Sequence, residues 1–336
     1  MNNNQLQDWI TDLNKTFGTK VKTEKRLPDE RATQYRRLLD DIADNTNYLN
    51  DYLICNFEDT RLSQPLISQL LSLYYRGGIA RCFVLQIVPS ITSMYLTGIT
   101  KRQKQCTSMF ETFLLAIYNE EILAGGPGSP VMNKKSEEIR IPSVGYPSIY
   151  HDPSKIQPYP EVTQLKYGGS PSVQKTIRIG PYPPMDRIIA ENRFTLLTKL
   201  LKSINGNISH MSAHVICRSY CRSLITICKS GFSFPESEFR HRILKDEASS
   251  EILGDHSKKP RIPVSPYFLI ESLNGLHFAL FNGHADLSLR ALDAIHQRAQ
   301  YEMLADVLLA TNAIKNSLQE THNIKSMLEL EVNGAS

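Results

Sequence analysis

Four residues with metal-ligating side chains occur at helical spacing in the second half of the chain. They are His210, His214, Cys217 and Cys221, at successive offsets of four, three and four, which would place them on one stripe of a helix. These side chains are typical zinc ligands, but one straight helix offers a tetrahedral ion only about two of its ligands. No second Cys or His pair with ligand spacing lies elsewhere. The pattern therefore favours a buried, reduced stripe, because free cysteine behaves as a small core hydrophobe.

No other pattern in the sequence points to catalysis or to a bound cofactor. A Gly-x-Ser-x-Gly elbow is lacking, and the cluster at 125–130 is not followed by the Gly-Lys-Ser/Thr of a phosphate-binding loop. Adjacent acids such as Asp40 and Asp41 diverge by about 100° on a helix, which is typical of a solvated face. We therefore predict no catalytic residue, no cofactor and no metal.

Composition indicates a globular chain and argues against nucleic acid as a partner. Of the 336 residues, 41% are hydrophobic and 21% charged, and the formal net charge is only +4. The basic residues are scattered in small groups, such as 101–104 and 258–261, whereas duplex binding needs a concentrated basic face. A weak attraction to anionic lipid headgroups is compatible with these groups.

Two further features favour the cytosol over a secreted or membrane-spanning chain. The N-terminus has no basic region followed by an apolar stretch, and the six cysteines show no paired spacing, so reduced thiols are expected. The longest apolar segment, Ile79 to Met94, is interrupted by Arg81, Gln86 and Pro89 and is shorter than the roughly 20 residues that span a bilayer. No transmembrane helix is expected.

Residues 1–124 carry apolar side chains mainly at spacings of three and four, which indicates amphipathic helices. The Gly77-Gly78 pair predicts a break, and Pro65 is expected in the first turn of its helix. The spacing predicts helices over 4–16, 30–55, 62–75, 79–98 and 105–123.

Residues 125–184 differ in kind, because eleven of the eighteen prolines fall there and would end helices. Two alternating stretches, 138–141 and 175–179, predict the strands of one short hairpin. The aromatic and proline residues around Ile149, Tyr150 and His151 fit either a partner-binding loop or a strap whose Ile149 and Tyr150 plug into helices. We favour the strap, since a proline-rich stretch stays ordered chiefly when its apolar residues find a surface.

Helical spacing resumes at Met185, continues from Met211 to Cys228, and predicts three helices between 267 and 318, with Asn282-Gly283 as a turn. The polar stretch 233–259 is expected to be a mobile loop with a short helix, and 319–336 a tail. The predicted fold is mostly α: an irregular helical bundle or solenoid-like domain with a Pro-rich extended insertion and one short β-hairpin. Parts 1–124, 125–184 (the extended strap) and 185–318 would form one folded unit overall.

Three separated segments of this sequence resemble the hyccin family in order and approximate spacing. The matching strings are IPSVGYPSIYHDPS at 141–154; GPYP at 180–183 running to AENRFTLL at 190–197; and RIPVS at 261–265 continuing through 281–283, 291–293, 298–300 and 312–315. With weaker likeness at 74–77 and 114–121, the resemblance covers most of residues 5 to 318. Two departures are a longer 233–259 stretch and the near absence of the long polar tail common in that family.

The resemblance implies a role that composition does not show. Members of the family are helical, non-catalytic subunits that bind a tetratricopeptide-repeat scaffold, and the pair joins the type III alpha phosphatidylinositol 4-kinase. A membrane-anchored partner recruits the assembly from the cytosol to the plasma membrane, where the kinase makes phosphatidylinositol 4-phosphate. The contact of this chain with the membrane would then be indirect or weak. Two alternatives stay open: a peripheral protein that binds lipid directly through its basic groups, and, less favoured, a zinc-dependent enzyme using the stripe from His210 to Cys221.

An adaptor of this kind is expected to cover a large apolar surface against its scaffold. The C-terminal helices are the predicted contact, because their apolar residues cover more of the helix circumference than one core contact requires. Core burial inside the chain would explain at least half of them. The predicted partner-binding residues are Leu289, Leu292, Ile295, Met303, Leu304, Val307 and Leu308.

Overall fold

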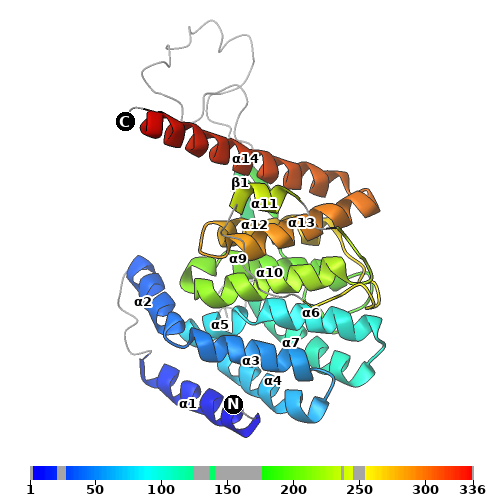
Figure 1. Ribbon diagram of the computed structural model, residues 1–336. Helices are drawn as coiled ribbons and strands as arrows, with labels where there is room; N and C mark the ends of the chain where they lie inside the picture. Colours follow the sequence, from blue (N-terminus) through cyan, green and yellow to red (C-terminus); the bar gives the residue numbers. More distant parts are fainter. Residues whose placement is uncertain are drawn as a thin grey trace, which may run out of the picture. The chain divides into compact units, whose positions relative to one another are not determined.

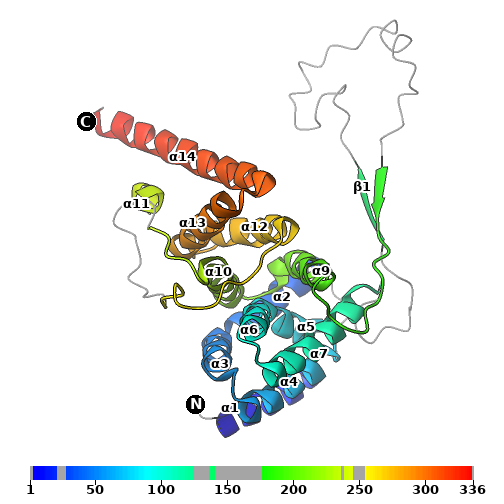
Figure 2. The ribbon, with the colours of Figure 1, turned by 90° about the vertical axis from the view of Figure 1, so that its right-hand side faces the viewer.

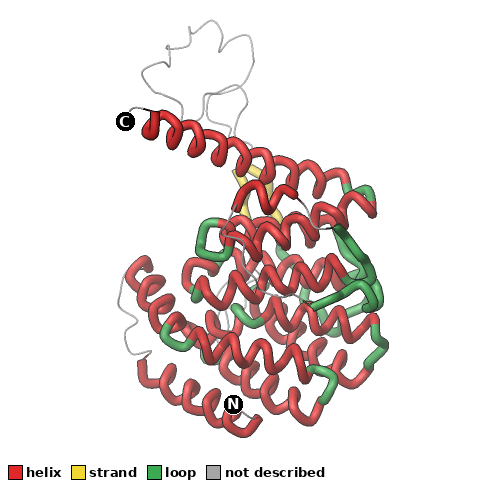
Figure 3. The backbone as a smooth tube through the Cα atoms, viewed as in Figure 1, coloured by secondary structure: helices red, strands yellow, loops and turns green. Residues whose placement is uncertain are grey.

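The computed structural model describes residues 3–20, 28–123, 136–140, 176–235, 238–244 and 254–334. Within these ranges the chain is mostly helical (Figure 1, Figure 3), which confirms the predicted fold class. Contacts divide the chain into two units, a larger one made of Met1–Glu121 with Met185–Ser336 and a smaller one, Ile122–Pro184. The larger unit is therefore assembled from two separate stretches of sequence.

The first stretch of the larger unit centres on one fully enclosed helix, α6, in which every residue from Val88 to Gly98 is buried. Two of its polar side chains bond within the helix: the Ser93 hydroxyl donates to the Ser90 carbonyl (2.8 Å) and the Thr97 hydroxyl to the Ser93 carbonyl (2.7 Å). The Ser90 hydroxyl lies 2.9 Å from the hydroxyl of Ser219. The helices of this stretch are α1 (Asn3–Lys20), α2 (Pro28–Asp40), α3 (Ala43–Asn56), α4 (Thr60–Tyr74), α5 (Gly78–Leu85), α6 (Val88–Thr100) and α7 (Lys104–Glu121).

The second stretch extends the same core. In Figure 1 the helices succeed one another in layers, and α6 packs between α7 and α10, α10 against α13, and α13 against α14. Figure 2 shows the last turns of α14 projecting past α13. The elements of this stretch are α9 (Arg193–Asn205), the 3-10 helix η3 (Ile208–His210), α10 (Ala213–Lys229), α11 (Glu238–Leu244), α12 (Pro266–Leu280), α13 (Ala285–Glu302) and α14 (Ala305–Gly334).

The side chain of Asn119 joins the two stretches where the first ends and the second begins. Its Nδ2 donates to the Met185 carbonyl (2.8 Å), and its Oδ1 accepts from the Met185 backbone N–H (3.0 Å). The chain thus returns to the end of α7 after passing through the smaller unit.

The predicted break at Gly77-Gly78 and the predicted turn at Asn282-Gly283 are both confirmed. Gly77 and Gly78 have φ of 72° and 53°, and Gly283 has φ of 86° between α12 and α13. A positive φ is inexpensive for glycine but strained for other residues, so these positions end helices sharply. Met303, which ends α13 in the left-handed conformation (φ 55°), adopts such a strained angle without being glycine.

Several predicted helix bounds were wrong. The helix expected over 30–55 is two helices, α2 and α3, and the one expected over 79–98 is α5 and α6, bent by 43° at Gln86 and Ile87. The helix expected to resume at Met185 begins only at Arg193, and α14 continues to Gly334 through the residues expected to form a tail.

The placement of Pro65 was also wrong, because α4 starts two residues earlier than expected. The Asp59 carboxylate accepts from the Arg61 N–H (2.9 Å) and caps the helix there, so Pro65 is its sixth residue and lies inside it.

The smaller unit contains the predicted hairpin. Strands β1 (Glu137–Arg140) and β2 (Thr176–Ile179) pair antiparallel, with Glu138 opposite Arg178. The Arg178 guanidinium donates to the Glu138 carboxylate on the exposed surface (2.8 Å). The strap residues Ile149, Tyr150 and His151 lie outside the described residues.

Among the described helices, none is by itself long and apolar enough to cross a bilayer. The α5–α6 pair passes that test of length and composition together, but it is bent and its residues are mostly buried in the protein core.

Candidate partner-binding surfaces

Helix α13 is an interior helix rather than an exposed one. It packs against α10, α11, α12 and α14. Leu289, Leu292 and Ile295 are at most 1% exposed. These three predicted contact residues therefore have no surface to offer a partner, and that part of the prediction was wrong. The apolar residues cover several faces of α13 because its neighbours within the chain surround it.

The turn from α13 into α14 does leave apolar side chains exposed. Met303 is 84% exposed and Leu309 75%, whereas Val307 is fully buried and so was wrongly assigned to a partner contact. Leu304 and Leu308 are half-buried. For Met303, Leu304 and Leu308, partner binding stays a prediction. We call Met303, Leu304, Leu308 and Leu309 the apolar corner.

The apolar corner is held rigidly by the end of α13. The guanidinium of Arg298, which is 2% exposed, donates to the Ile262 carbonyl (2.6 Å) and the Glu302 carboxylate (2.7 Å), and it lies 4.3 Å from the centre of the Phe232 ring. Phe232 contacts Tyr301 edge-on at 4.8 Å. Such a fixed base reduces the conformational entropy that binding would otherwise cost.

Polar contacts attach the first half of α14 to α13. Lys315 forms an ion pair with Asp293 (2.7 Å), and the Thr311 hydroxyl lies 2.8 Å from His296 Nδ1. Burial and the neighbouring Lys315 lower the pKa of His296, so the ring is neutral at physiological pH. The exposed side chains in the first half of α14 are therefore carried by a helix that is fixed to α13.

An open groove of about 700 Å³ runs between α4 and α7. Its lining mixes apolar and polar side chains, among them Ile67, Leu71, Met109 and Phe113 with Gln64. Sequence reasoning did not single out this groove, although Met109 and Phe113 stand four residues apart and therefore share a helix face.

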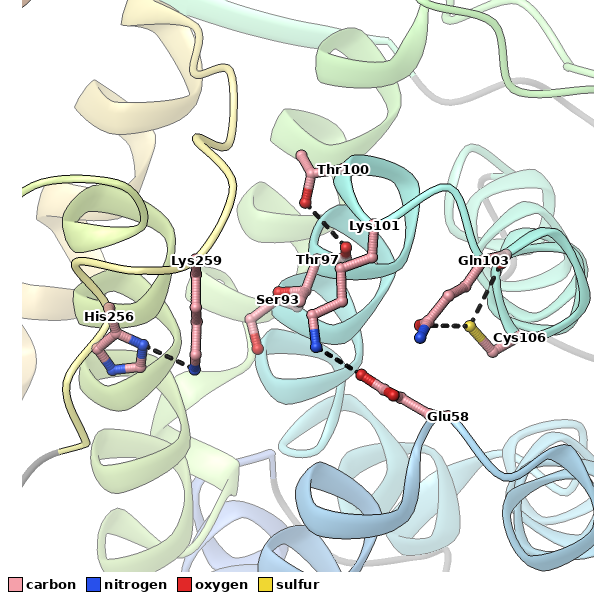
Figure 4. A network of polar contacts seen from close by, with 9 residues as sticks. All are labelled: Glu58, Ser93, Thr97, Thr100, Lys101, Gln103, Cys106, His256 and Lys259. Carbon is pink, nitrogen blue, oxygen red and sulfur yellow. Dashed lines mark hydrogen bonds and ion pairs between the residues drawn. The ribbon is translucent and has the colours of Figure 1, made fainter.

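Three separate segments bring lysines together at the ends of α6 and α10. Lys101 follows α6, Lys229 ends α10, and Lys258 and Lys259 lie in the segment between α11 and α12. We call these four residues the basic edge. Figure 4 shows Lys101 paired with Glu58 (2.6 Å) and Lys259 beside His256 (2.9 Å). The sequence showed 101–104 and 258–261 as separate groups, and only the fold joins them.

The Cys/His stripe does not form the single-helix constellation that its spacing predicts. His210 lies in η3, outside α10, and the exposed His214 ring contacts His284 edge-on at 5.4 Å. Cys217 and Cys221 are buried, and burial raises the pKa of each thiol to about 12, so both are protonated at neutral pH. Within the described part of the chain, no group of three or more His, Cys, Asp or Glu side chains is placed to hold a metal ion.

Three largely buried ionisable residues, Tyr74, Arg81 and Glu121, form a hydrogen-bonded network between α4, α5 and α7. Glu121 Oε1 accepts from the Tyr74 hydroxyl (2.6 Å) and from Arg81 Nε (2.7 Å), and its Oε2 accepts from Arg81 Nη2 (2.7 Å). Burial raises the pKa of Glu121, but the bonds and charge of Arg81, together with bonds from Tyr74 and Ser203, outweigh burial and lower that pKa. Arg81 also donates to Asn207 (3.2 Å), so the network links both stretches of the larger unit.

These features define a class of protein before any family is considered. The chain is a helical protein. Its buried carboxylate, Glu121, is fully occupied by hydrogen bonds within the core, and exposed apolar side chains gather at the turn between α13 and α14. That combination is typical of an interaction subunit.

A family model described as Hyccin matches residues 34–334. The match covers nearly the whole chain, and the chain belongs to the Hyccin family. Membership supports a non-catalytic adaptor role in general.

Proposed function

We propose that this chain is a non-catalytic adaptor that binds a tetratricopeptide-repeat scaffold and supports assembly of the type III alpha phosphatidylinositol 4-kinase complex. Together with a membrane-anchored recruiting subunit, the assembly would move from the cytosol to the plasma membrane for phosphatidylinositol 4-phosphate synthesis. The observation that carries the proposal is the family match over residues 34–334.

The apolar corner supports a protein contact at the C-terminal helices. Met303 and Leu309 place large exposed apolar side chains on a base fixed by Arg298. Stable interfaces bury about 1,200–2,000 Å² in total and depend on a few central anchors. The corner would supply the anchors, and neighbouring surface of α14 the remaining area.

Co-expression of the full chain with the scaffold and the kinase tests the proposal. We expect the three to co-purify, and we expect the yield of active kinase to fall when this chain is omitted. A folded chain, checked by circular dichroism, that captures neither the scaffold nor the kinase would refute the proposal.

Leu309→Asp tests the position of the contact. Leu309 is 75% exposed, so the substitution leaves the core intact and should weaken scaffold capture about tenfold or more, the cost of one interface anchor. Phe281→Asp is the matched control, because Phe281 is 64% exposed and lies at the opposite end of α13, just after α12. Equal losses in both variants would exclude the corner as the contact. Ile295→Asp would be uninformative, since Ile295 is fully buried and a carboxylate in its place should unfold the chain.

A further inference from the structure

The basic edge collects positive charge that the described residues around it do not neutralise. Among these residues, two carboxylates interact with its four lysines: Glu58 pairs with Lys101, and Asp255 lies beside Lys258 and Lys259, so two positive charges are in excess. His256, the nearest polar partner of Lys259, contributes no compensating charge. Burial, then Lys259 and then Lys229 lower the pKa of His256 to about 4, so its ring is neutral at pH 7.

Two of the four lysines, Lys229 and Lys259, are half-buried, so their charges are less well hydrated than those of the exposed Lys101 and Lys258. Lys259 is half-buried, and burial followed by repulsion from Lys101 lowers the pKa of its ammonium group. In Figure 4 the ends of the Lys101 and Lys259 side chains lie on either side of Ser93. The two like charges are thus held near each other by the fold.

Backbone contacts fix the segment that carries Lys258 and Lys259. The Gly231 N–H, just after α10, donates to the His256 carbonyl (3.0 Å), and the Lys259 N–H donates to the same carbonyl (3.1 Å). The Ser257 N–H donates to the Asp255 carboxylate (2.8 Å). The lysines are therefore presented by an ordered turn, which lowers the entropy lost when they bind a ligand.

We propose that the basic edge binds a phosphate-bearing anion. A phosphate group carries up to two negative charges and several acceptor oxygens, which match convergent ammonium donors from separate segments. Such an anion neutralises the excess positive charge and reduces the repulsion between the ammonium groups of Lys101 and Lys259. The proposal does not rest on the adaptor function, because it concerns the isolated full chain.

His256 is a built-in reporter of anion binding. We would follow its ring protons by NMR in the full chain, in sodium chloride and in sodium sulfate of equal ionic strength, and assign them by their loss in His256→Asn. Sulfate stands in for phosphate because its charge is constant over this pH range. In chloride the ring should stay neutral down to pH 5. In sulfate the neutralised lysines should let it titrate above pH 5. Identical titrations in both salts would overturn the proposal.

Lys258→Gln tests which residues bind. Lys258 is exposed, so its loss should leave the fold unchanged and weaken the affinity for inorganic phosphate at pH 7.5 about tenfold, as expected for one charge-assisted contact. Lys15→Gln, which removes one charge from a 76% exposed side chain on α1, is the matched control and should leave that affinity unchanged. Equal weakening in the two variants would show general electrostatics and overturn the site.

Vesicles distinguish a lipid headgroup from a free phosphate compound. The full chain should co-sediment with phosphatidylcholine vesicles containing phosphatidic acid, but not with phosphatidylcholine alone, if the phosphate belongs to a lipid. Binding of free phosphate without vesicle capture assigns the site to a soluble ligand or a phosphopeptide.

Discussion

Replacing Glu121 by Gln removes one charge from the network of Arg81, Tyr74 and Glu121 with little change in shape. The carboxylate accepts three bonds from these two partners, two at Oε1 and one at Oε2. An amide has one oxygen and one NH₂ group, so it cannot accept at both positions. Either orientation turns an NH₂ donor toward an Arg81 donor.

The magnitude follows from how deeply the pair is buried. The Glu121 side chain is 6% exposed and the Arg81 side chain 18%. Removing one partner of a buried ion pair leaves the other charge uncompensated and costs about 3–5 kcal/mol of unfolding free energy. That is a large part of the roughly 5–15 kcal/mol by which domains are stable. The melting temperature of the larger unit should fall by about 6 °C or more.

The assay is thermal and urea unfolding of the full chain, followed by circular dichroism at pH 7. Glu58→Gln is the matched control: it makes the same chemical change in a side chain that is 46% exposed and paired with Lys101. An exposed pair is worth at most about 1 kcal/mol, so this variant should unfold close to the wild type.

The double variant Arg81→Met/Glu121→Leu separates a lost interaction from an unpaired charge. Replacing both partners with apolar side chains should recover much of the stability lost in Glu121→Gln, because no buried charge remains. The reasoning would be refuted if the melting temperature of Glu121→Gln fell by less than about 2 °C. It would also be refuted if the double variant lost more unfolding free energy than the two single variants lose when their losses are added.

Three further measurements test the packing and the charges of the core. Because the folded-state pKa of Glu121 lies below its ordinary 4.5, the stability contributed by its charge is complete above pH 4.5 and is lost as pH falls through the lowered pKa. The difference in urea midpoint between wild type and Glu121→Gln should therefore narrow in that acidic range. A difference that stays constant with pH would contradict this. Gly275→Ala would place its Cβ 2.5 Å from the Tyr220 ring and should cost about 1–3 kcal/mol in urea unfolding, whereas Gly254→Ala meets nothing within 4 Å and serves as the control; similar midpoints for both would refute the clash. A thiol reagent should label one cysteine rapidly, the exposed Cys55, since the other five are buried; two or more fast thiols would show that the core opens.

The sequence predicts the helical class well because apolar spacing reports burial directly. Helices α4 and α7 match their predicted ranges within a few residues, and the glycine pair at 77–78 marks a real break. The bend at Gln86 and Ile87 was missed because α5 and α6 are buried on nearly all faces, which removes the periodicity that would show where one helix ends. The turn between α2 and α3 was missed because Asp40 and Asp41 carry no glycine or proline signal.

The candidate surfaces were less predictable, since burial by a neighbour within the chain and burial by a partner require the same residue types. Leu289 and Leu309 are both leucines at helical spacing, yet one is 1% exposed and the other 75%. Only the packing of α13 among its neighbours distinguishes them. The basic edge joins Lys101 to Lys259 across more than 150 positions of sequence, a proximity that no local pattern encodes.

The pair of hydrogen bonds between Asn119 and Met185 has a consequence for the evolution and the engineering of this chain. Since both ends of the intervening stretch are held at one point on the helices, its length is nearly free to vary: doubling a loop costs only about 0.6 kcal/mol. Insertions, deletions or a grafted reporter protein should be accepted between Glu121 and Met185 while the helical body keeps its fold. Related chains can therefore diverge there in size without redesigning the core.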